Sequence, residues 1–393
     1  MIAVDKSGNV IIMPTTPTKR AYRYRCYPTD EQAVELSRTF GCVRLVYNLA
    51  LEARTTAWRQ YRRQVSYTDT SALLTEWKRT EDLRFLSEVS SVPLQQGLRH
   101  LQTAFTNFFQ HGAQYPRFKS RKRGKASAEY TASAFRWRHG QLTLAKMTEP
   151  LNIRWSRPLP ADARPSTVTV SRDRAGRWHV SILVHTVTPH LPAATAEIGI
   201  DLGVTALATL STGEKIPNPQ HEKRERACLA RAQRRMARKV KDSRNRAKAA
   251  RKVARVYAQI ADRRRDVLHK LSTRLIRENQ VVVVEALSVR TMMKNHRLAR
   301  AISDASWSKF QSMLRYKGAW YGRTVIFIDR WFPSSKTCSR CGHSLDRLEL
   351  NVREWTCPAC HTVHDRDVNA AVNILAAGRA VAACGDRTRP TRR

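Results

Sequence analysis

The stretch AEIGIDLGVTALATLSTGEKI, residues 196–216, decides the fold. Its short apolar runs, interrupted at Gly203 and at the turn STGE, predict three consecutive β-strands. Asp201 lies inside the first run, where a charged side chain is costly to bury unless it is paired or bound to a metal ion. The alternative is an edge strand on which Asp201 faces solvent. The order of the elements that follow indicates whether Asp201 is buried with a partner or exposed on an edge strand.

The remaining elements are those of an α/β domain. A long helical segment covers residues 221–278, because its apolar residues keep to one helical face. A strand follows at 280–287 (QVVVVEAL), then a helix near 305–321, a strand at 323–332 (RTVIFIDRWF) and a closing helix from Asp367. The order is three strands, helix, strand, helix, strand, insert, helix. This is the order of the ribonuclease-H-like fold, a mixed sheet flanked by helices.

Three acidic residues occupy related places in that order. Asp201 lies in the first strand, Glu285 ends the fourth, and Asp367 begins the closing helix. In a ribonuclease-H-like sheet these two strands are neighbours and the helix begins beside them, so the three carboxylates converge. Carboxylates that close together require a cation, and two Mg²⁺ ions roughly 4 Å apart are the usual arrangement for phosphodiester cleavage. The sequence therefore predicts a magnesium-dependent nuclease with Asp201, Glu285 and Asp367 as catalytic residues.

Each acid also has a structural interpretation. Strands often end on an acid, as at Glu285, and an aspartate at a helix N-terminus is a common cap. The segment HDRDVNAAVNIL, residues 364–375, contains both Asp365 and Asp367 before its apolar helix. Asp367 is predicted to be the metal ligand because it lies in the first helical turn. Asp365 is predicted to cap or position the helix.

Four of the eight cysteines form two CxxC pairs separated by fifteen residues. They are Cys338, Cys341, Cys357 and Cys360, and the other four are scattered. This spacing predicts a zinc ribbon in which four thiolates form a closed structural site. His343, His361 and His364 are nearby alternative ligands, which a full thiolate set makes unnecessary. The remaining alternative is four unrelated buried cysteines.

The charge balance predicts a polyanionic partner. The chain of 393 residues has 71 Lys and Arg against 32 acids, a net charge of +39 and a pI near 10.9. Its longest strongly apolar stretch, VVVV at 281–284, is far shorter than the roughly 18 residues of a membrane span. The N-terminus lacks the layout of a signal peptide. We therefore expect no membrane association and a nucleic-acid partner inside the cell, contacted by basic segments such as 115–125 and 221–278.

The first half of the chain predicts a separate lobe. Residues 1–19 are expected to be a loose arm, and RAYRYRCYPT at 20–29 alternates like a strand. Thr29 and Gln32 form a capping box that begins a helical region reaching to about residue 112. Residues 126–190 then contain strand patterns, including a hairpin around the turn DRAG. Aromatic side chains interleaved with basic ones are expected either to stack on unpaired bases or to pack in a small barrel.

These motifs together resemble the RuvC-type nuclease of the TnpB family, RNA-guided endonucleases carried by insertion sequences. The resemblance rests on GIDLG, VVVVEAL, the two CxxC pairs and HDRDVNAAVNIL. Further similar segments follow in the family order: YRCYPTDEQ, GCVRLVYN, AFTNFF, YPRFKSRK, RRRDVLHKLS and SDASWSKF. They cover residues 20–378. One departure is His361, directly after the last cysteine, where the family usually has glycine.

The resemblance implies a domain plan and a set of partners. The implied parts are a flexible arm (1–19), a wedge β-barrel (20–28 and 113–190), a helical recognition domain (29–112), a RuvC-like nuclease domain (193–378) with a zinc ribbon insert (333–363), and a disordered tail (379–393). It implies Mg²⁺ at Asp201, Glu285 and Asp367, Zn²⁺ at the four cysteines, a guide RNA and a double-stranded DNA target beside a short motif. The expected state is a monomer with RNA, in the cytoplasm of a prokaryotic cell.

Three alternatives remain open. A compact type V CRISPR effector shares this nuclease, although the short recognition lobe favours TnpB. An RNA-guided protein that binds DNA without cutting is disfavoured by the intact set of three acids. A structural ribonucleoprotein component with a zinc ribbon would have no use for buried acids.

Overall fold

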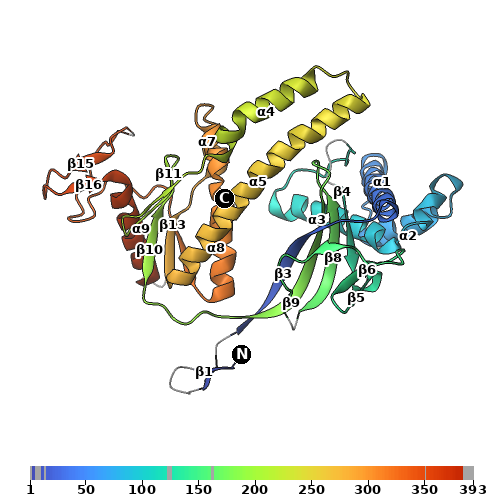
Figure 1. Ribbon diagram of the computed structural model, residues 1–393, viewed down its shortest axis with the longest axis horizontal. Helices are drawn as coiled ribbons and strands as arrows, with labels where there is room; N and C mark the ends of the chain where they lie inside the picture. The colour runs from blue at the N-terminus through green and yellow to red at the C-terminus, as the bar shows by residue number, and fades with distance from the viewer. Residues whose placement is uncertain are drawn as a thin grey trace. The chain divides into compact units, whose positions relative to one another are not determined.

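The computed structural model describes residues 2–4, 10–12, 15–121, 126–160, 163–349 and 351–383 (Figure 1). The chain divides into two compact units, Pro17–Thr186 and a second one made of Met1–Thr16 and Val187–Arg393. Each unit has its own sheet and its own apolar core.

The C-terminal unit is built on a five-stranded sheet in the order β12-β11-β10-β13-β14. These strands are β10 (Glu197–Asp201), β11 (Ala206–Leu210), β12 (Lys215–Pro217), β13 (Val281–Glu285) and β14 (Thr324–Ile328). β11 is antiparallel to both of its neighbours, whereas β10, β13 and β14 run parallel. The first and fourth strands are therefore neighbours, and the predicted ribonuclease-H-like order is confirmed.

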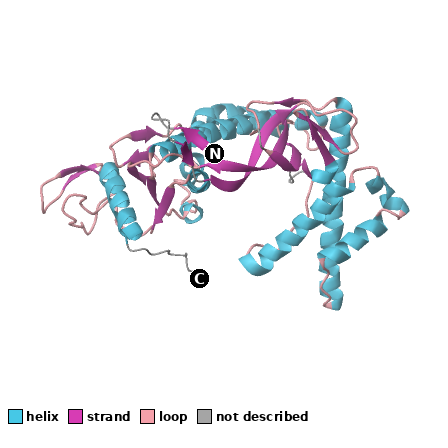
Figure 2. Ribbon diagram, turned by 90° about the horizontal axis from the view of Figure 1, so that it is seen from below, coloured by secondary structure: helices cyan, strands magenta, loops and turns pink. Residues whose placement is uncertain are grey.

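The helices of this unit are α4 (His221–Ala237), α5 (Arg244–Glu278), α6 (Val289–Met292), α7 (Ala299–Ala305), α8 (Trp307–Tyr321) and α9 (Arg366–Ala383). Helices cover both faces of the sheet, and α4 packs on α5. α5 and α8 lie on one face and α9 on the other (Figure 1). Leu275 and Phe310 pack in the core of the first face, and Ile374 packs in the core of the second. In both views the hairpin of β15 (Glu354–Thr356) and β16 (Val363–Asp365) lies beside α9 (Figure 2).

Two expectations about these helices were wrong in detail. The basic segment 221–278 is two helices, because Asp242 adopts a positive φ of 62° and the Ser243 side chain caps α5. The tail was expected to be disordered from residue 379, yet α9 continues to Ala383. Arg379 holds this last turn by donating to the carboxylate of Glu197 at 2.6 Å. The rest of the expected tail lies outside the described residues.

α9 approaches the sheet very closely at Gly199 of β10. A Cβ at this position would overlap the carbonyl oxygen of Ala371 and lie 2.8 Å from the backbone nitrogen of Leu375. Both atoms belong to the backbone of α9, which cannot rotate away as a side chain can. The absence of a side chain at residue 199 is therefore a condition for this packing.

We expect Gly199→Ala to destabilise the C-terminal unit by about 1–3 kcal/mol, the usual cost of forcing an extra methyl group into a packed interior. The matched control is Gly41→Ala in α1 (Asp30–Tyr61), where a Cβ meets nothing within 4 Å. The control should gain about 0.5–1 kcal/mol, because alanine is the better helix former. Urea unfolding of both variants measures the difference, and equal midpoints would contradict the close approach.

The N-terminal unit contains a second five-stranded sheet, in the order β4-β8-β9-β3-β7, and a separate hairpin. The strands are β3 (Thr15–Cys26), β4 (Ala126–Thr131), β7 (Ile153–Arg154), β8 (Arg164–Arg172) and β9 (Trp178–Pro189), with the hairpin of β5 (Phe135–Arg138) and β6 (Gln141–Leu144). Pairing among the described residues leaves β4 and β7 at the edges, so this is an open sheet where a closed barrel was expected. The β8–β9 hairpin around Asp173–Gly176 is as predicted.

The predicted loose arm at residues 1–19 is also wrong in part. β1 (Ile2–Val4) pairs with β2 (Val10–Ile12), and β3 already begins at Thr15. The reason is visible at Thr18, whose hydroxyl donates to the carbonyl oxygen of Thr186 in β9 and extends the sheet past the expected start. Residues 5–9, 13 and 14 lie outside the described part of the chain.

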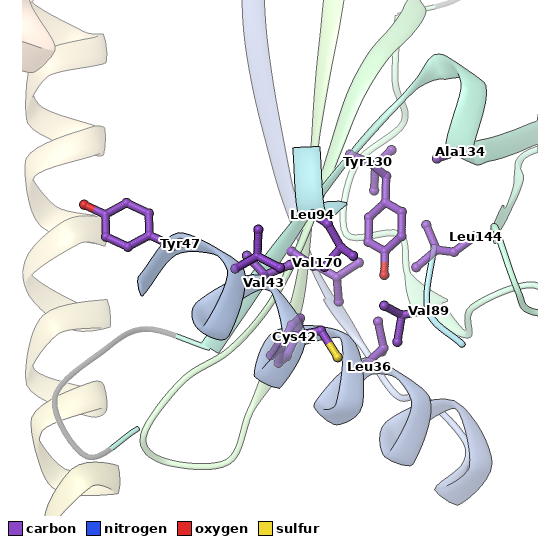
Figure 3. Packing of buried hydrophobic residues seen from close by; sticks show 14 of the residues in the cluster. Leu36, Cys42, Val43, Tyr47, Val89, Leu94, Tyr130, Ala134, Leu144 and Val170 are labelled. Atoms are coloured by element: carbon purple, nitrogen blue, oxygen red, sulfur yellow. The ribbon is translucent and has the colours of Figure 1, made fainter. Parts of the chain in front are cut away.

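The helices of this unit are α1, α2 (Tyr67–Trp77), α3 (Ser91–His111) and the 3-10 helices η1 (Glu81–Ser87) and η2 (Ala132–Ala134). α1 and α3 pack on the sheet, and α2 packs on α3. Both hydrogen bonds of the predicted capping box between Thr29 and Gln32 are present. Figure 3 shows Leu36 and Val43 of α1 packed with Tyr130 and Val170 of the sheet, in a core formed by both layers.

Candidate active site and metal centre

Two of the three predicted acids lie side by side at one edge of the C-terminal sheet. Ile200 of β10 is opposite Val284 of β13 in parallel register, and the next residue along each strand is Asp201 or Glu285. Carboxyl ends of parallel strands meet at the same edge, which is where ligands bind in open α/β sheets. The parallel pairing of β10 and β13 therefore explains why the two acids are neighbours.

The acids at this edge influence each other electrostatically. Burial, and then the nearby Asp367 carboxylate, raise the pKa of Asp201 to about 7, while the positive charges of Arg366 and Arg353 act in the opposite direction. Burial, followed by the Asp201 carboxylate, raises the pKa of Glu285 to about 7. Asp201 thus interacts with both of the other predicted acids, so the three form one electrostatic group.

The two aspartates before α9 have different roles. Asp365 Oδ1 accepts hydrogen bonds from the backbone nitrogens of Asp367 at 3.1 Å and Val368 at 3.0 Å. Lys215 Nζ lies 2.5 Å from Asp365 Oδ2. The prediction that Asp365 caps the helix is therefore confirmed. The Asp367 carboxylate does no capping, and its partner is the Arg353 guanidinium at 3.5 Å.

The structure does not bring the three acids to the distances of a shared ion. Within the described ranges, the four cysteines are the one group of three or more potential ligands close enough to hold a metal. Arg366 and Arg353 lower the pKa of Asp201 against the effects of burial and Asp367, and the Arg353 guanidinium also lies 3.5 Å from the Asp367 carboxylate.

A fourth acid was missed. Asp329 directly follows β14, whose Ile328 is opposite Glu285 in the sheet, and its carboxylate also raises the pKa of Glu285. The available signal was the same one that identified Glu285, an acid where an apolar strand ends. The expected strand 323–332 ran past this acid, which concealed it.

The four cysteines form a compact cluster. Their sulfur atoms all lie within 4.8 Å of one another, with Cys338–Cys360 and Cys341–Cys357 separations of 3.6 Å. Four thiolates at 2.3 Å from a tetrahedral zinc ion would be roughly 3.8 Å apart, so the arrangement fits zinc. Backbone bonds from Gly342 to Cys338 and from His361 to Cys357, both 2.9 Å, close the two knuckles.

The knuckles differ at one corresponding position. Gly342 has a φ of 77°, which glycine adopts freely, whereas His361 has a φ of 57°, a left-handed conformation that costs other residues energy. This is the position at which the sequence departs from the TnpB pattern. Of the three histidines considered as alternative ligands, His364 contacts the cluster, with its Nε2 3.0 Å from Cys338 Sγ.

Two asparagines of α9 connect the cysteine cluster to the group formed by Asp201, Glu285 and Asp367, which we call the acidic edge. The side-chain nitrogens of Asn369 and Asn373 donate to the carbonyl oxygens of Ser334 and Thr337, and Asn369 Oδ1 accepts from the backbone nitrogen of Ser339. Spaced four apart, they lie on one face of the helix that begins next to Asp367. The loop that carries Cys338 is thereby fixed to the element that carries one of the acids.

Comparison with known proteins agrees with this architecture. A Cas12f1 chain solved in complex with sgRNA and target DNA is similar in fold, with a TM-score of 0.55 and 13% identity, over 91% of this chain and 98% of that one. Models of a probable transposase family (179–296), a Cas12f1-like TNB domain (307–374) and a helix-turn-helix domain (13–63) also match.

Two relatives of high coverage establish the family to which this chain belongs. A Streptomyces pristinaespiralis protein is 69% identical over 95% of this chain and 93% of its own length. One from Escherichia coli K12, InsQ, is 32% identical over 93% and 94%. Both are named "Putative RNA-guided DNA endonuclease". The chain belongs to the TnpB family of insertion-sequence proteins, and the predicted resemblance is confirmed.

The helix-turn-helix match differs from the observed secondary structure. The match to a helix-turn-helix domain falls on residues 13–63, where the described chain has a strand followed by one continuous helix, α1. The next helix, α2, begins at Tyr67, after the matched range.

None of the helices in the described ranges combines the length and apolarity of a bilayer span.

Proposed function

We propose that this chain is an RNA-guided DNA endonuclease of an insertion sequence, which cuts target DNA beside a short motif. The observation that carries the proposal is the pair Asp201 and Glu285 at the shared edge of β10 and β13, with Asp367 in the same electrostatic group. The names of the relatives, matched over nearly their full lengths, support it. A compact type V CRISPR effector is the alternative, supported only at the level of the shared fold.

The donor set suits Mg²⁺. Asp201, Glu285 and Asp367 would hold the ions, since carboxylate oxygens are the ligands that Mg²⁺ prefers. When bound, Mg²⁺ would supply an activated water and stabilise the leaving oxygen of the phosphodiester. The chain itself contributes the positions of the carboxylates: the sheet fixes two of them, and the Asp365 cap fixes the start of the helix that carries the third.

The raised pKa values of Asp201 and Glu285 predict a pH-dependent metal effect. In the folded chain the pKa values of about 7 mean that these acids keep their protons up to that pH, whereas the unfolded chain releases them near pH 4. Their stabilising contribution is therefore present at low pH and lost as the pH rises to about 7. Above that pH the ionised group attracts a cation, so we expect Mg²⁺ to raise the thermal midpoint clearly at pH 8 and hardly at pH 5.5.

Scanning fluorimetry with and without Mg²⁺ measures this effect. The control is Asp201→Asn together with Glu285→Gln, which removes both charges at nearly constant volume and should abolish the Mg²⁺ shift at either pH. An equal shift in wild type and in this variant would exclude the acidic edge as the metal site.

The four cysteines are proposed to bind one structural zinc ion. Four thiolates complete a tetrahedron and leave no open position for water or substrate. The role we assign to the zinc is therefore to fold the segment between β14 and α9. Arg353, the partner of Asp367, lies within this segment, so a folded segment would also keep its guanidinium near that carboxylate.

The proposed partners are a guide RNA and double-stranded DNA, bound by a single copy of the chain. The charge of +39 suits a chain that contacts a folded RNA and a heteroduplex through their phosphates. Exposed arginines line α4 and α5, and the basic loop 115–121 adds more; Lys122, Arg123 and Lys125 of the predicted patch lie outside the described residues. Binding should weaken steeply with salt.

The deciding experiment changes only the RNA. RNA that co-purifies with the chain is sequenced, its guide segment is replaced, and DNA with a matching sequence beside the same motif is offered. We expect the cut to move to the new match. If the protein without RNA still cuts one fixed DNA sequence, the guided function is wrong and the chain is a conventional sequence-specific nuclease.

A further inference from the structure

An exposed tryptophan follows the acidic edge of the C-terminal sheet. Trp331 is 78% exposed, more than any other tryptophan in the described chain, and it comes three residues after the end of β14. Single exposed apolar residues are normal on protein surfaces. What distinguishes Trp331 is the loop that carries it, residues 329–334.

One end of this loop is fixed to the strand of Glu285. The backbone nitrogen of Ala286, the next residue, donates to the carbonyl oxygen of Ile328 at 3.0 Å. Asp329 Oδ1 then accepts from the backbone nitrogen of Trp331 at 2.7 Å, and the Asp329 carbonyl oxygen accepts from Phe332 at 3.2 Å. The tryptophan backbone is therefore held in a tight turn directly beside the acid.

The other end is fixed to the helix of Asp367. The backbone nitrogen of Ser334 donates to the carbonyl oxygen of Phe332 at 2.8 Å, and the Ser334 carbonyl oxygen accepts from the Asn373 side chain at 2.8 Å. Asn373 belongs to α9, which has Asp367 in its first turn. The loop thus bridges the two elements that supply Glu285 and Asp367.

The chemistry of the loop suits a nucleobase. The Arg330 guanidinium lies 5.0 Å from the centroid of the Trp331 ring, so a positive charge accompanies an exposed aromatic surface. Aromatic rings with an adjacent arginine are the usual platform for unpaired bases, and the arginine also attracts the phosphates. Bases inside a duplex are covered by their neighbours, and only an unwound strand presents a free base.

We propose that Trp331, supported by Arg330, stacks on an unpaired base of the DNA strand that is being cut and holds that strand over the acidic edge. This deepens the proposed function and rests on it. Trp331 is a substrate-binding residue here, and the turn at Asp329 is the device that keeps it at a fixed place relative to Glu285.

The first test is photochemical crosslinking. The Asp201→Ala complex, assembled with its RNA, receives target DNA with 5-iodouracil in place of thymine in either strand and is irradiated and digested with trypsin. We expect crosslinked DNA on the peptide WFPSSK, residues 331–336, which trypsin releases after Arg330 and Lys336. No crosslink on this peptide would overturn the proposal.

The second test is single-turnover cutting of bound target. Trp331→Ala should slow cutting roughly five- to hundredfold, the range expected for loss of one base stack, and Trp331→Phe should retain most of the rate. The reference is Trp58→Ala, because Trp58 is also exposed and has Arg62 at 5.8 Å from its ring. If Trp331→Ala cuts as fast as Trp58→Ala, the stacking proposal is wrong and the proposed function still stands. If wild-type complexes cut no matched DNA, the proposed function itself is wrong.

Discussion

Asp201→Ala is expected to reduce cutting of a matched DNA target at least about a thousandfold, while RNA and target binding persist. The reason is that removing one carboxylate from the acidic edge costs several kcal/mol of charge stabilisation at the reacting phosphate. Asp201 is the last residue of the central strand β10 and belongs to none of the basic segments 115–121, α4 and α5, so its loss should leave nucleic-acid binding by these segments unchanged. Cutting is measured on end-labelled DNA and binding by gel shift under the same conditions.

The neighbouring aspartates provide a sharp control. Asp367→Ala should be as inactive as Asp201→Ala, whereas Asp365→Asn should cut normally, because asparagine caps a helix as well as aspartate does. An inactive Asp365→Asn together with an active Asp367→Ala would mean that the ligand and the capping residue are exchanged. A wild-type rate for Asp201→Ala would remove the acidic edge from the mechanism.

Cys357→Ser is expected to have the largest effect on stability. Zinc binding to small four-ligand sites is worth about 10–16 kcal/mol, and in such modules this is the folding free energy. The variant should lose the zinc, about one ion per chain in the wild type, and its segment 333–365 should become sensitive to proteases. Elemental analysis and limited proteolysis measure the two effects.

The control for this substitution is Cys228→Ser, an exposed cysteine of α4 outside the cluster, which should keep both zinc and protease resistance. Full zinc content in Cys357→Ser would mean that His364, 3.0 Å from Cys338 Sγ, replaces the missing thiolate. Combining Cys357→Ser with His364→Ala distinguishes this case, since zinc would then be lost.

The predictions that succeeded rest on local patterns with one physical meaning. Two CxxC pairs fifteen residues apart describe a four-thiolate site, and the four sulfur atoms do lie together. The alternation of apolar strands and helices gave the sheet order, from which the neighbourhood of Asp201 and Glu285 follows. The capping role of Asp365 followed from the pairing of two aspartates before an apolar helix.

The features that were missed depend on backbone geometry or on distant contacts. The break before α5 needs the positive φ of Asp242, which no apolar periodicity reveals. Asp329 was missed because the expected strand 323–332 ran past it, and its place near Glu285 follows only from the parallel register of β13 and β14. The open sheet of the N-terminal unit likewise depends on which strands pair, and strand patterns alone do not state whether the edges meet.

The contact at Gly199 limits how the acidic edge can move. Because the backbone of α9 lies directly against β10 there, the helix cannot slide or turn without separating from the sheet. We therefore expect α9 and β10 to keep their relative position when substrate binds, so that changes in this part of the unit fall mainly between Ser334 and α9. Hydrogen exchange should accordingly be slow for the amides of the first half of α9, with or without nucleic acid, and should change mainly between residues 334 and 364 when target DNA binds.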